Sequence, residues 1–280
     1  MSPLVAAFIR SAAAPALLVM VATFFVSKVP EFQRARVIAG LVAFGFVIGH
    51  YLLIYRLSFP PADASESLSY VAVLLFVFVL MFPGLHSAPY LLRAIFVVGI
   101  GFLTLYHLGG GLLSNGVHQR NLLAFFFLGL GVWSILEKSA HGVGTISLIG
   151  LPLITATSLS FLLLFGGSAS WSQMVSVLCA ILGGLMALSW FRPKAVPKSA
   201  VVPFISVFLV AMMAAGHFNL EINPWKMIVI SFPFLLLWIR RFLAFVPAKE
   251  RTEFVLLMAM AGAPMAYYVW DAFKVAGPLY

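Results

Sequence analysis

The sequence predicts an all-α integral membrane protein, a bundle of about ten transmembrane helices. Hydrophobic residues make up 63% of its 280 residues, and charged residues only 9%. Apolar runs of roughly 15 to 25 residues recur along the chain, and a helix of about 20 apolar residues crosses the ~30 Å hydrocarbon core of a bilayer. The runs are continuously apolar rather than alternating, which favours helices over the strands of a transmembrane barrel.

The first apolar run follows Arg10 and ends at Lys28, Val29 and Pro30. A signal peptide usually carries its positive charge closer to its start and ends in an A-x-A-like cleavage site. We therefore expect this run to be retained as the first membrane span.

Ten spans are predicted from apolar runs that are interrupted by charge, proline and glycine. In chain order they are residues 10–29, 37–56, 68–85, 90–108, 121–136, 145–165, 172–190, 200–217, 225–245 and 252–273. The third, fifth and eighth are short, so nine spans are an alternative, and each boundary carries an error of a few residues.

The basic residues predict the orientation, because Lys and Arg are retained on the cytoplasmic side of a membrane. Twelve lie in or beside the loops after odd-numbered spans: Lys28, Arg34, Arg36, Arg93, Lys138, Arg192, Lys194, Lys198, Arg240, Arg241, Lys249 and Arg251. Five lie on the opposite side: Arg10, Arg56, Arg120, Lys226 and Lys274. Both termini are therefore expected outside the cytoplasm, on the periplasmic side of an inner membrane if the host is Gram-negative.

The net charge of +9 comes from these scattered loop residues. They form no basic patch of the kind that binds nucleic acid, so the expected partner is the lipid bilayer. A small-molecule or lipid substrate and other subunits of a membrane complex are further candidate partners.

A division after Lys138 gives halves 1–138 and 139–280 with five predicted spans each. An odd number of spans per half gives the second half the opposite orientation, which is the inverted-repeat plan of many transporters. In size and span count the chain resembles the drug/metabolite transporter superfamily, which implies transport of a small solute. Members of that superfamily usually start in the cytoplasm, so the predicted orientation departs from it. The alternative is a single membrane domain, 1–280, without a repeat.

Carboxylates are missing from the centres of the predicted spans. Each lies in a loop or within about a turn of a span end, as Glu66, Glu137 and Glu253 do. Charges inside a membrane are costly and usually functional. Their placement argues against a carboxylate-based proton antiporter and leaves facilitated or dipole-guided transport open.

Spans two, four and eight all run outward in this topology and each ends in a histidine, while neighbouring loops add three polar residues. The candidate site is His50, His107, His217, His118, Arg120 and Glu221. These residues could be amphipathic interface anchors, a substrate or proton-relay site that receives an anionic group, or metal or haem ligands. The metal interpretation rests on His50, His107 and His217, which lack a tight spacing such as H-x3-H. No cofactor is assigned.

Glycines and prolines predict how the helices pack and where they are interrupted. Gly45 and Gly49 form a small-xxx-small stripe, which favours close packing inside the bundle over dimerisation. Pro203, Pro233 and Pro264 fall within the last three predicted spans. Interrupted helices line cavities in transporters, so any moving part is expected in the C-terminal half.

The near-equal halves and late prolines favour a transporter of a small solute or a lipid-linked metabolite. One alternative is a membrane-embedded enzyme or a quinol- or haem-linked redox subunit that uses the outer histidines. The spacing from Arg36 to His50 resembles an arrangement in membrane acyltransferases, which would place acyl transfer at His50. Another alternative is an accessory subunit of an envelope complex.

Overall fold

The computed structural model describes residues 9–54, 64–82, 89, 92–93, 95–96, 99, 116–240 and 250–276. All regular elements in these ranges are helices. In chain order they are η1 (Ile9–Ala13), α2 (Ala14–Val26), α3 (Glu31–Ile54), α4 (Ala64–Met81), α7 (Gly116–Ser139), α8 (Thr145–Phe165), α9 (Ala169–Phe191), α10 (Lys198–Leu220), α11 (Pro224–Val229), α12 (Phe232–Ile239) and α13 (Glu250–Ala276). Seven segments are long and apolar enough to cross a membrane: η1 with α2, α3, α7, α8, α9, α10 and α13. The chain is therefore a multi-pass membrane protein.

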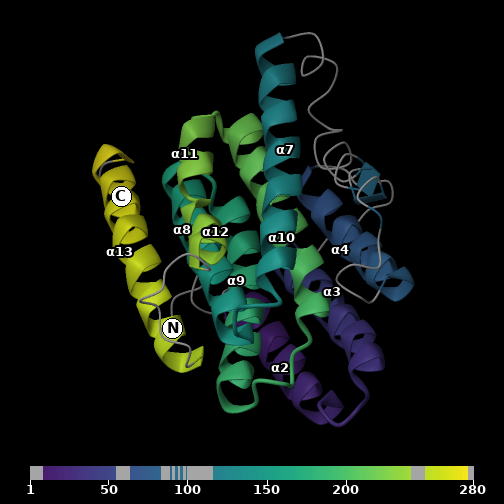
Figure 1. Ribbon diagram of the computed structural model, residues 1–280. Coiled ribbons are helices and arrows are strands. Elements are labelled where there is room, and N and C mark those ends of the chain that lie inside the picture. Colours follow the sequence, from purple (N-terminus) through teal and green to yellow (C-terminus); the bar gives the residue numbers. More distant parts are fainter. Residues whose placement is uncertain are drawn as a thin grey trace.

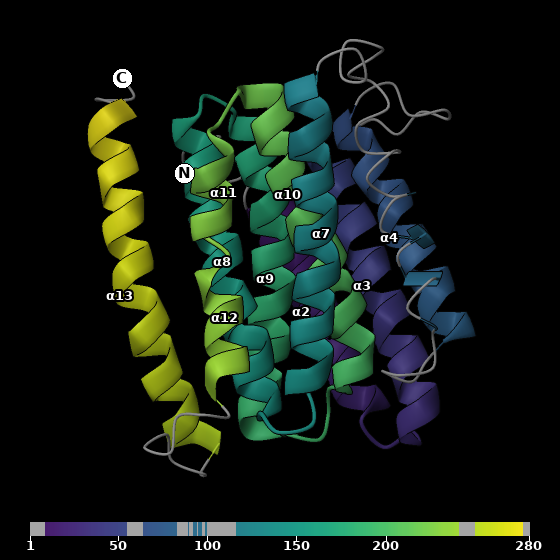
Figure 2. The same cartoon turned by 45° about the horizontal axis from the view of Figure 1, so that its top comes forward.

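The helices stand side by side in a bundle with α10 near its middle and α13 at its edge (Figures 1 and 2). Of the span formed by α10, 94% is buried inside the protein, against 22% for α13. Every residue from Ala200 to Gly216 is buried. A helix that is apolar on all sides is suited to this central position, because no face requires water.

Gly216 lets the neighbouring helices approach α10 closely. A Cβ at this position would lie 2.6 Å from Leu163 of α8 and 2.8 Å from Met227 of α11. The last turns of α8 and α10 and the short α11 therefore form one tight corner of the bundle.

The stripe formed by Gly45 and Gly49 packs inside the bundle, as predicted. A Cβ at Gly45 would lie 2.6 Å from Val19 of α2, and one at Gly49 would lie 2.5 Å from Val177 of α9. The stripe thus lets α3 pack closely against α2 and α9 of the same chain.

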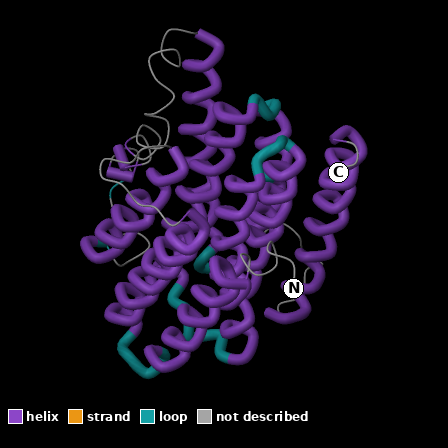
Figure 3. The backbone as a smooth tube through the Cα atoms, turned by 180° about the vertical axis from the view of Figure 1, so that it is seen from behind, coloured by secondary structure: helices purple, strands orange, loops and turns teal. Residues whose placement is uncertain are grey.

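Two ends of the bundle are distinguished by their polar contacts. At one end Asn121 of α7 bonds His217 of α10, and Phe165 of α8 contacts Phe273 of α13. We call this end the histidine face. At the opposite end, the basic face, Arg240 pairs with Glu253, and the ammonium of Lys198 donates to two carbonyls of the α7–α8 loop. Figure 3 shows the bundle from behind, and in its described part the helices are joined by short loops and turns.

The predicted spans match the observed helices to differing degrees. The predicted span 145–165 has the same bounds as α8. The predicted span 121–136 begins too late, because α7 begins at Gly116. The predicted span 225–245 corresponds to α11 and α12, which are separated by Ile230 and Ser231, and its residues after Arg240 lie outside the described part of the chain. Most of the predicted span 90–108 lies outside the described residues, so ten spans and a repeat of 1–138 by 139–280 stay predictions.

Candidate functional site at the histidine face and the interrupted helix

His217 lies on the last turn of α10 and joins three elements. Its Nδ1 lies 2.7 Å from the carbonyl oxygen of Ile222, in the loop that leads to α11. A carbonyl only accepts hydrogen bonds, so Nδ1 carries the hydrogen. On the other side of the ring, the amide of Asn121 donates to Nε2 over 2.8 Å. These two bonds select the neutral Nδ1–H tautomer of His217 and hold α7, α10 and the loop together.

Glu221 contributes to this arrangement through its backbone. It ends α10 with a φ of 53°, the only described residue other than glycine in the left-handed region. That conformation is costly for a residue with a Cβ. It reverses the chain and brings the Ile222 carbonyl back to His217. The side chain of Glu221 is exposed.

His118 and Arg120 lie on the first turns of α7. The ring of His118 lies 5.9 Å from that of Phe218, which in turn lies 4.7 Å from His217. The predicted loop residue His118 and the predicted helix-end residue His217 therefore both contact one phenylalanine, Phe218. Arg120 is exposed beside them and supplies a permanent positive charge.

His50 has a different environment. It is fully buried on α3, and its Nδ1 lies 2.5 Å from Oγ of Ser69 on α4. One turn earlier, Phe46 packs against Phe208 of α10 with ring centroids 4.6 Å apart. His217 follows Phe208 by nine residues, or about two and a half turns at 3.6 residues per turn, so the two point to opposite sides of α10. The central helix thus separates His50 from the pair formed by His118 and His217.

The metal interpretation required His50, His107 and His217 to meet. His107 lies outside the described residues. Among the residues that are described, no group of three His, Cys, Asp or Glu side chains is arranged to hold a metal ion.

Of the three prolines that the sequence places within late spans, Pro233 lies at an interruption, the one between α11 and α12, whereas Pro203 and Pro264 lie inside the continuous helices α10 and α13. Ile230 and Ser231 lie between the two short helices and are buried. The hydroxyl of Ser231 donates 3.2 Å to the carbonyl of Met227 and lies 3.6 Å from Sδ of Met213 on α10. In Figure 2, α11 and α12 lie in line, one above the other, beside α8 and α10.

Two helix-start signals within one apolar run could have indicated this interruption. Asn223 caps α11 by accepting a 2.9 Å bond from the backbone N–H of Trp225, and Pro224 follows it. Pro233 then lies in the first turn of α12. Proline is favoured in the first turn of a helix, so two such signals nine residues apart predict two short helices.

Ionic contacts fix the basic face. Arg93 and Glu137 form a buried ion pair, and the Arg93 guanidinium lies 5.7 Å from the ring centre of Trp133. Arg240 and Glu253 pair over 2.8 Å. Both carboxylates lie within four residues of a helix end, as the sequence predicted. This end of the bundle is therefore held by charge, whereas the histidine face is held by neutral hydrogen bonds and aromatic rings.

Comparisons with known proteins give no family assignment: no family model, no curated protein and no solved structure matches this chain.

Proposed function

We propose that this protein transports a small solute or a lipid-linked metabolite across the membrane, and that the interruption between α11 and α12 lies on the substrate path. The interruption is the observation that carries the proposal. Many transporters bind substrate and coupling ions where a membrane helix is interrupted. A backbone group that lacks its regular helical partner is polar at a depth where lipid and regular helices supply none. In this chain the N–H groups of Ile230 and Ser231 bond the carbonyls of Lys226 and Ile228, so the group available at the interruption is a carbonyl.

The depth of the interruption supports this assignment. By a rise of 1.5 Å per residue, Ile230 and Ser231 lie roughly 11 Å from Asn223 and roughly 14 Å from Arg240, close to the middle of the span. Pro233 has no N–H and therefore cannot bond the carbonyl of Val229, four residues earlier. A backbone acceptor near mid-depth thus lacks its regular helical donor.

The histidine face supports the entry of an anionic substrate group in this proposal. Arg120 is exposed, and a guanidinium bonds carboxylates and phosphates strongly. His118 lies two residues before Arg120 on α7, and His217 shapes the loop that leads into α11. A substrate that contacts Arg120 would therefore lie at the end of the bundle where α11 begins.

Flux into reconstituted vesicles tests the proposal, with amino acids, sugars, nucleosides and lipid precursors as the panel. We expect one class to be transported. Pro233→Ala restores the missing helical donor and should reduce that flux about tenfold, or ~1.4 kcal/mol in barrier height. Pro264→Ala, in the continuous helix α13, is the matched control and should leave flux unchanged. No flux with any class, under either polarity of the gradient, would contradict the proposal.

The contact between His50 and Ser69 favours a second candidate, acyl transfer within the membrane. In that mechanism His50 would accept the proton of a hydroxyl that attacks the acyl carbon of a donor, and would return this proton to the donor's leaving group as its bond to the acyl carbon breaks. The test is Ser69→Ala in an assay with a radiolabelled acyl donor. Acyl transfer by the parent protein that is lost in the variant would favour this candidate over transport.

A further inference from the structure

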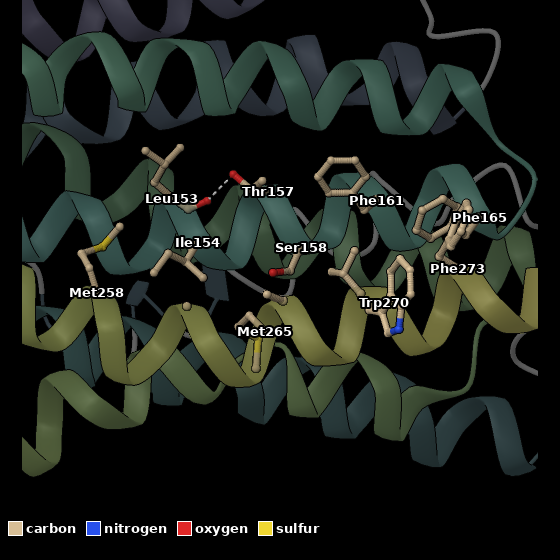
Figure 4. A pocket seen from close by; sticks show the side chains of 13 residues that line it. Leu153, Ile154, Thr157, Ser158, Phe161, Phe165, Met258, Met265, Trp270 and Phe273 are labelled. Atoms are coloured by element: carbon tan, nitrogen blue, oxygen red, sulfur yellow. Dashed lines mark hydrogen bonds between the residues drawn. The ribbon is translucent and has the colours of Figure 1, made fainter.

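A long apolar groove runs between α8 and α13, with a volume of about 620 Å³. Leu153, Ile154 and Met258 line one end, and four aromatic rings line the other (Figure 4). These rings belong to Phe161, Phe165, Trp270 and Phe273.

The groove lies between a tight contact of α13 with α8 towards the basic face and the ring contact of Phe165 with Phe273 at the histidine face. Towards the basic face, the ring of Phe254 packs so tightly on α8 that a Cβ at Gly150 would lie 2.5 Å from it. The carboxylate of Glu250 accepts a bond from the backbone N–H of Ile146 at the start of α8. Further along α13, a Cβ at Gly262 would meet no atom within 4 Å. The two helices are therefore in close contact near the basic face and leave space in the half towards the histidine face.

The length of the groove fits one hydrocarbon chain of one membrane leaflet. On α8 its lining extends from Leu153 to Phe165, which is ~18 Å at 1.5 Å per residue. Half of the ~30 Å hydrocarbon core of a bilayer is ~15 Å. The groove therefore has about the length of an acyl chain in the leaflet on the side of the histidine face.

The chemistry of the lining also fits a hydrocarbon chain. Thr157 and Ser158 are the only lining residues with a hydroxyl, and Thr157 donates its own to the carbonyl of Leu153 over 2.8 Å. Phe161, Trp270 and Phe273 keep 44%, 55% and 40% of their surface exposed, so the groove opens sideways towards the lipid. An acyl chain can enter it from the bilayer without crossing the bundle.

A positive charge lies at the end of the groove on the histidine face. The ammonium of Lys274 lies 5.5 Å from the ring centre of Trp270, which itself lines the groove. A lipid whose chain occupies the groove would place its headgroup at this level, where a phosphate is attracted to Lys274.

We propose that the groove between α8 and α13 binds one acyl chain of an anionic phospholipid, with the headgroup phosphate beside Lys274. The site is separate from the interruption between α11 and α12, and it does not depend on the transport proposal. It differs from general lipid contact because a groove with a closed end holds one chain in place.

The test is lipid retention after purification from vesicles that contain equal amounts of phosphatidylglycerol and phosphatidylcholine. We expect native mass spectrometry to find one retained phospholipid, predominantly phosphatidylglycerol. Gly262→Leu places a side chain in the groove and should reduce retention about tenfold, a change of ~1.4 kcal/mol. Gly183→Leu on α9 is the matched control, because a Cβ there also meets no atom within 4 Å, and it should retain the lipid.

Two further results decide the outcome. Lys274→Ala should keep one lipid but remove the preference for phosphatidylglycerol. The fluorescence of Trp270 is obtained as the part of the signal that Trp270→Phe removes. Phospholipids with brominated acyl chains should quench this fluorescence more strongly in the parent protein than in Gly262→Leu. Equal retention and equal quenching in Gly262→Leu and the parent would overturn the proposal, as would a retained lipid without preference in the parent.

Discussion

The side-chain amide of Asn121 lies 2.8 Å from Nε2 of His217 and so joins the start of α7 to the end of α10. The opposite nitrogen of the same ring donates to the carbonyl of Ile222. One neutral histidine therefore connects the central helix to a peripheral helix and to the loop that precedes the interrupted span. A substitution at Asn121 should therefore weaken the contacts among all three elements.

Asn121→Ala removes the donor to Nε2 and should reduce the free energy of unfolding by about 0.5–1.5 kcal/mol, the net value of one hydrogen bond. Thermal unfolding in detergent measures the change. Gln173→Ala, which removes another side-chain amide of intermediate burial, should cost less. Equal destabilisation by the two variants would show that the bond to His217 adds nothing.

Gly49→Ala should destabilise the bundle by about 1–3 kcal/mol, because its Cβ would lie 2.5 Å from both the Ser11 carbonyl and Val177. The matched control is Gly131→Ala on α7, where a Cβ meets nothing within 4 Å. The control should be neutral or slightly stabilising, since alanine favours helix. Melting temperatures of the two variants provide the comparison.

Glu137→Leu leaves Arg93 buried without its ion-pair partner and should cost about 3–5 kcal/mol. The double variant Arg93→Leu with Glu137→Leu removes both charges and should recover a large part of that loss. Yield and melting temperature of the single and double variants test this. A double variant that is less stable than Glu137→Leu alone would contradict the expected role of the pair.

A reporter that is active only in the cytoplasm should be silent when it is fused after residue 280. Twelve of the seventeen basic residues favour a cytoplasmic position for the basic face, which is opposite to the end of the bundle where α13 ends. A reporter that is active only outside the cytoplasm is the matched fusion and should give a signal. The reverse pattern would place the histidine face in the cytoplasm.

The helical class and most element positions could be predicted from the sequence, because apolar length is decisive in a membrane. The prediction 145–165 equals α8, since glycines delimit this apolar stretch at both ends, Gly144 before it and Gly166 after it. The start of α7 was placed five residues too late because its first turns are polar: His118, Gln119 and Arg120 extend the helix beyond the apolar run.

The contacts at the candidate site could not be predicted in the same way. Residues on all sides of α10 are apolar, so hydrophobicity does not show which side faces α3 and which faces α7. The separation of His50 from His217 depends on how α10 is rotated about its own axis in the bundle. The ion pair of Arg93 and Glu137 joins residues 44 positions apart and depends on how two helices meet.

Cysteine accessibility at Ser231 tests the central claim, that the interruption between α11 and α12 lies on a substrate path, without knowledge of the substrate. Ser231→Cys and Ser206→Cys would each be made in a Cys179→Ser background, which removes the only native thiol. Both serines are buried at similar depth, but Ser206 lies in the continuous helix α10. In membranes, a small charged thiol reagent should label Ser231→Cys and leave Ser206→Cys unlabelled. Failure to label Ser231→Cys from either side of the membrane would contradict the account.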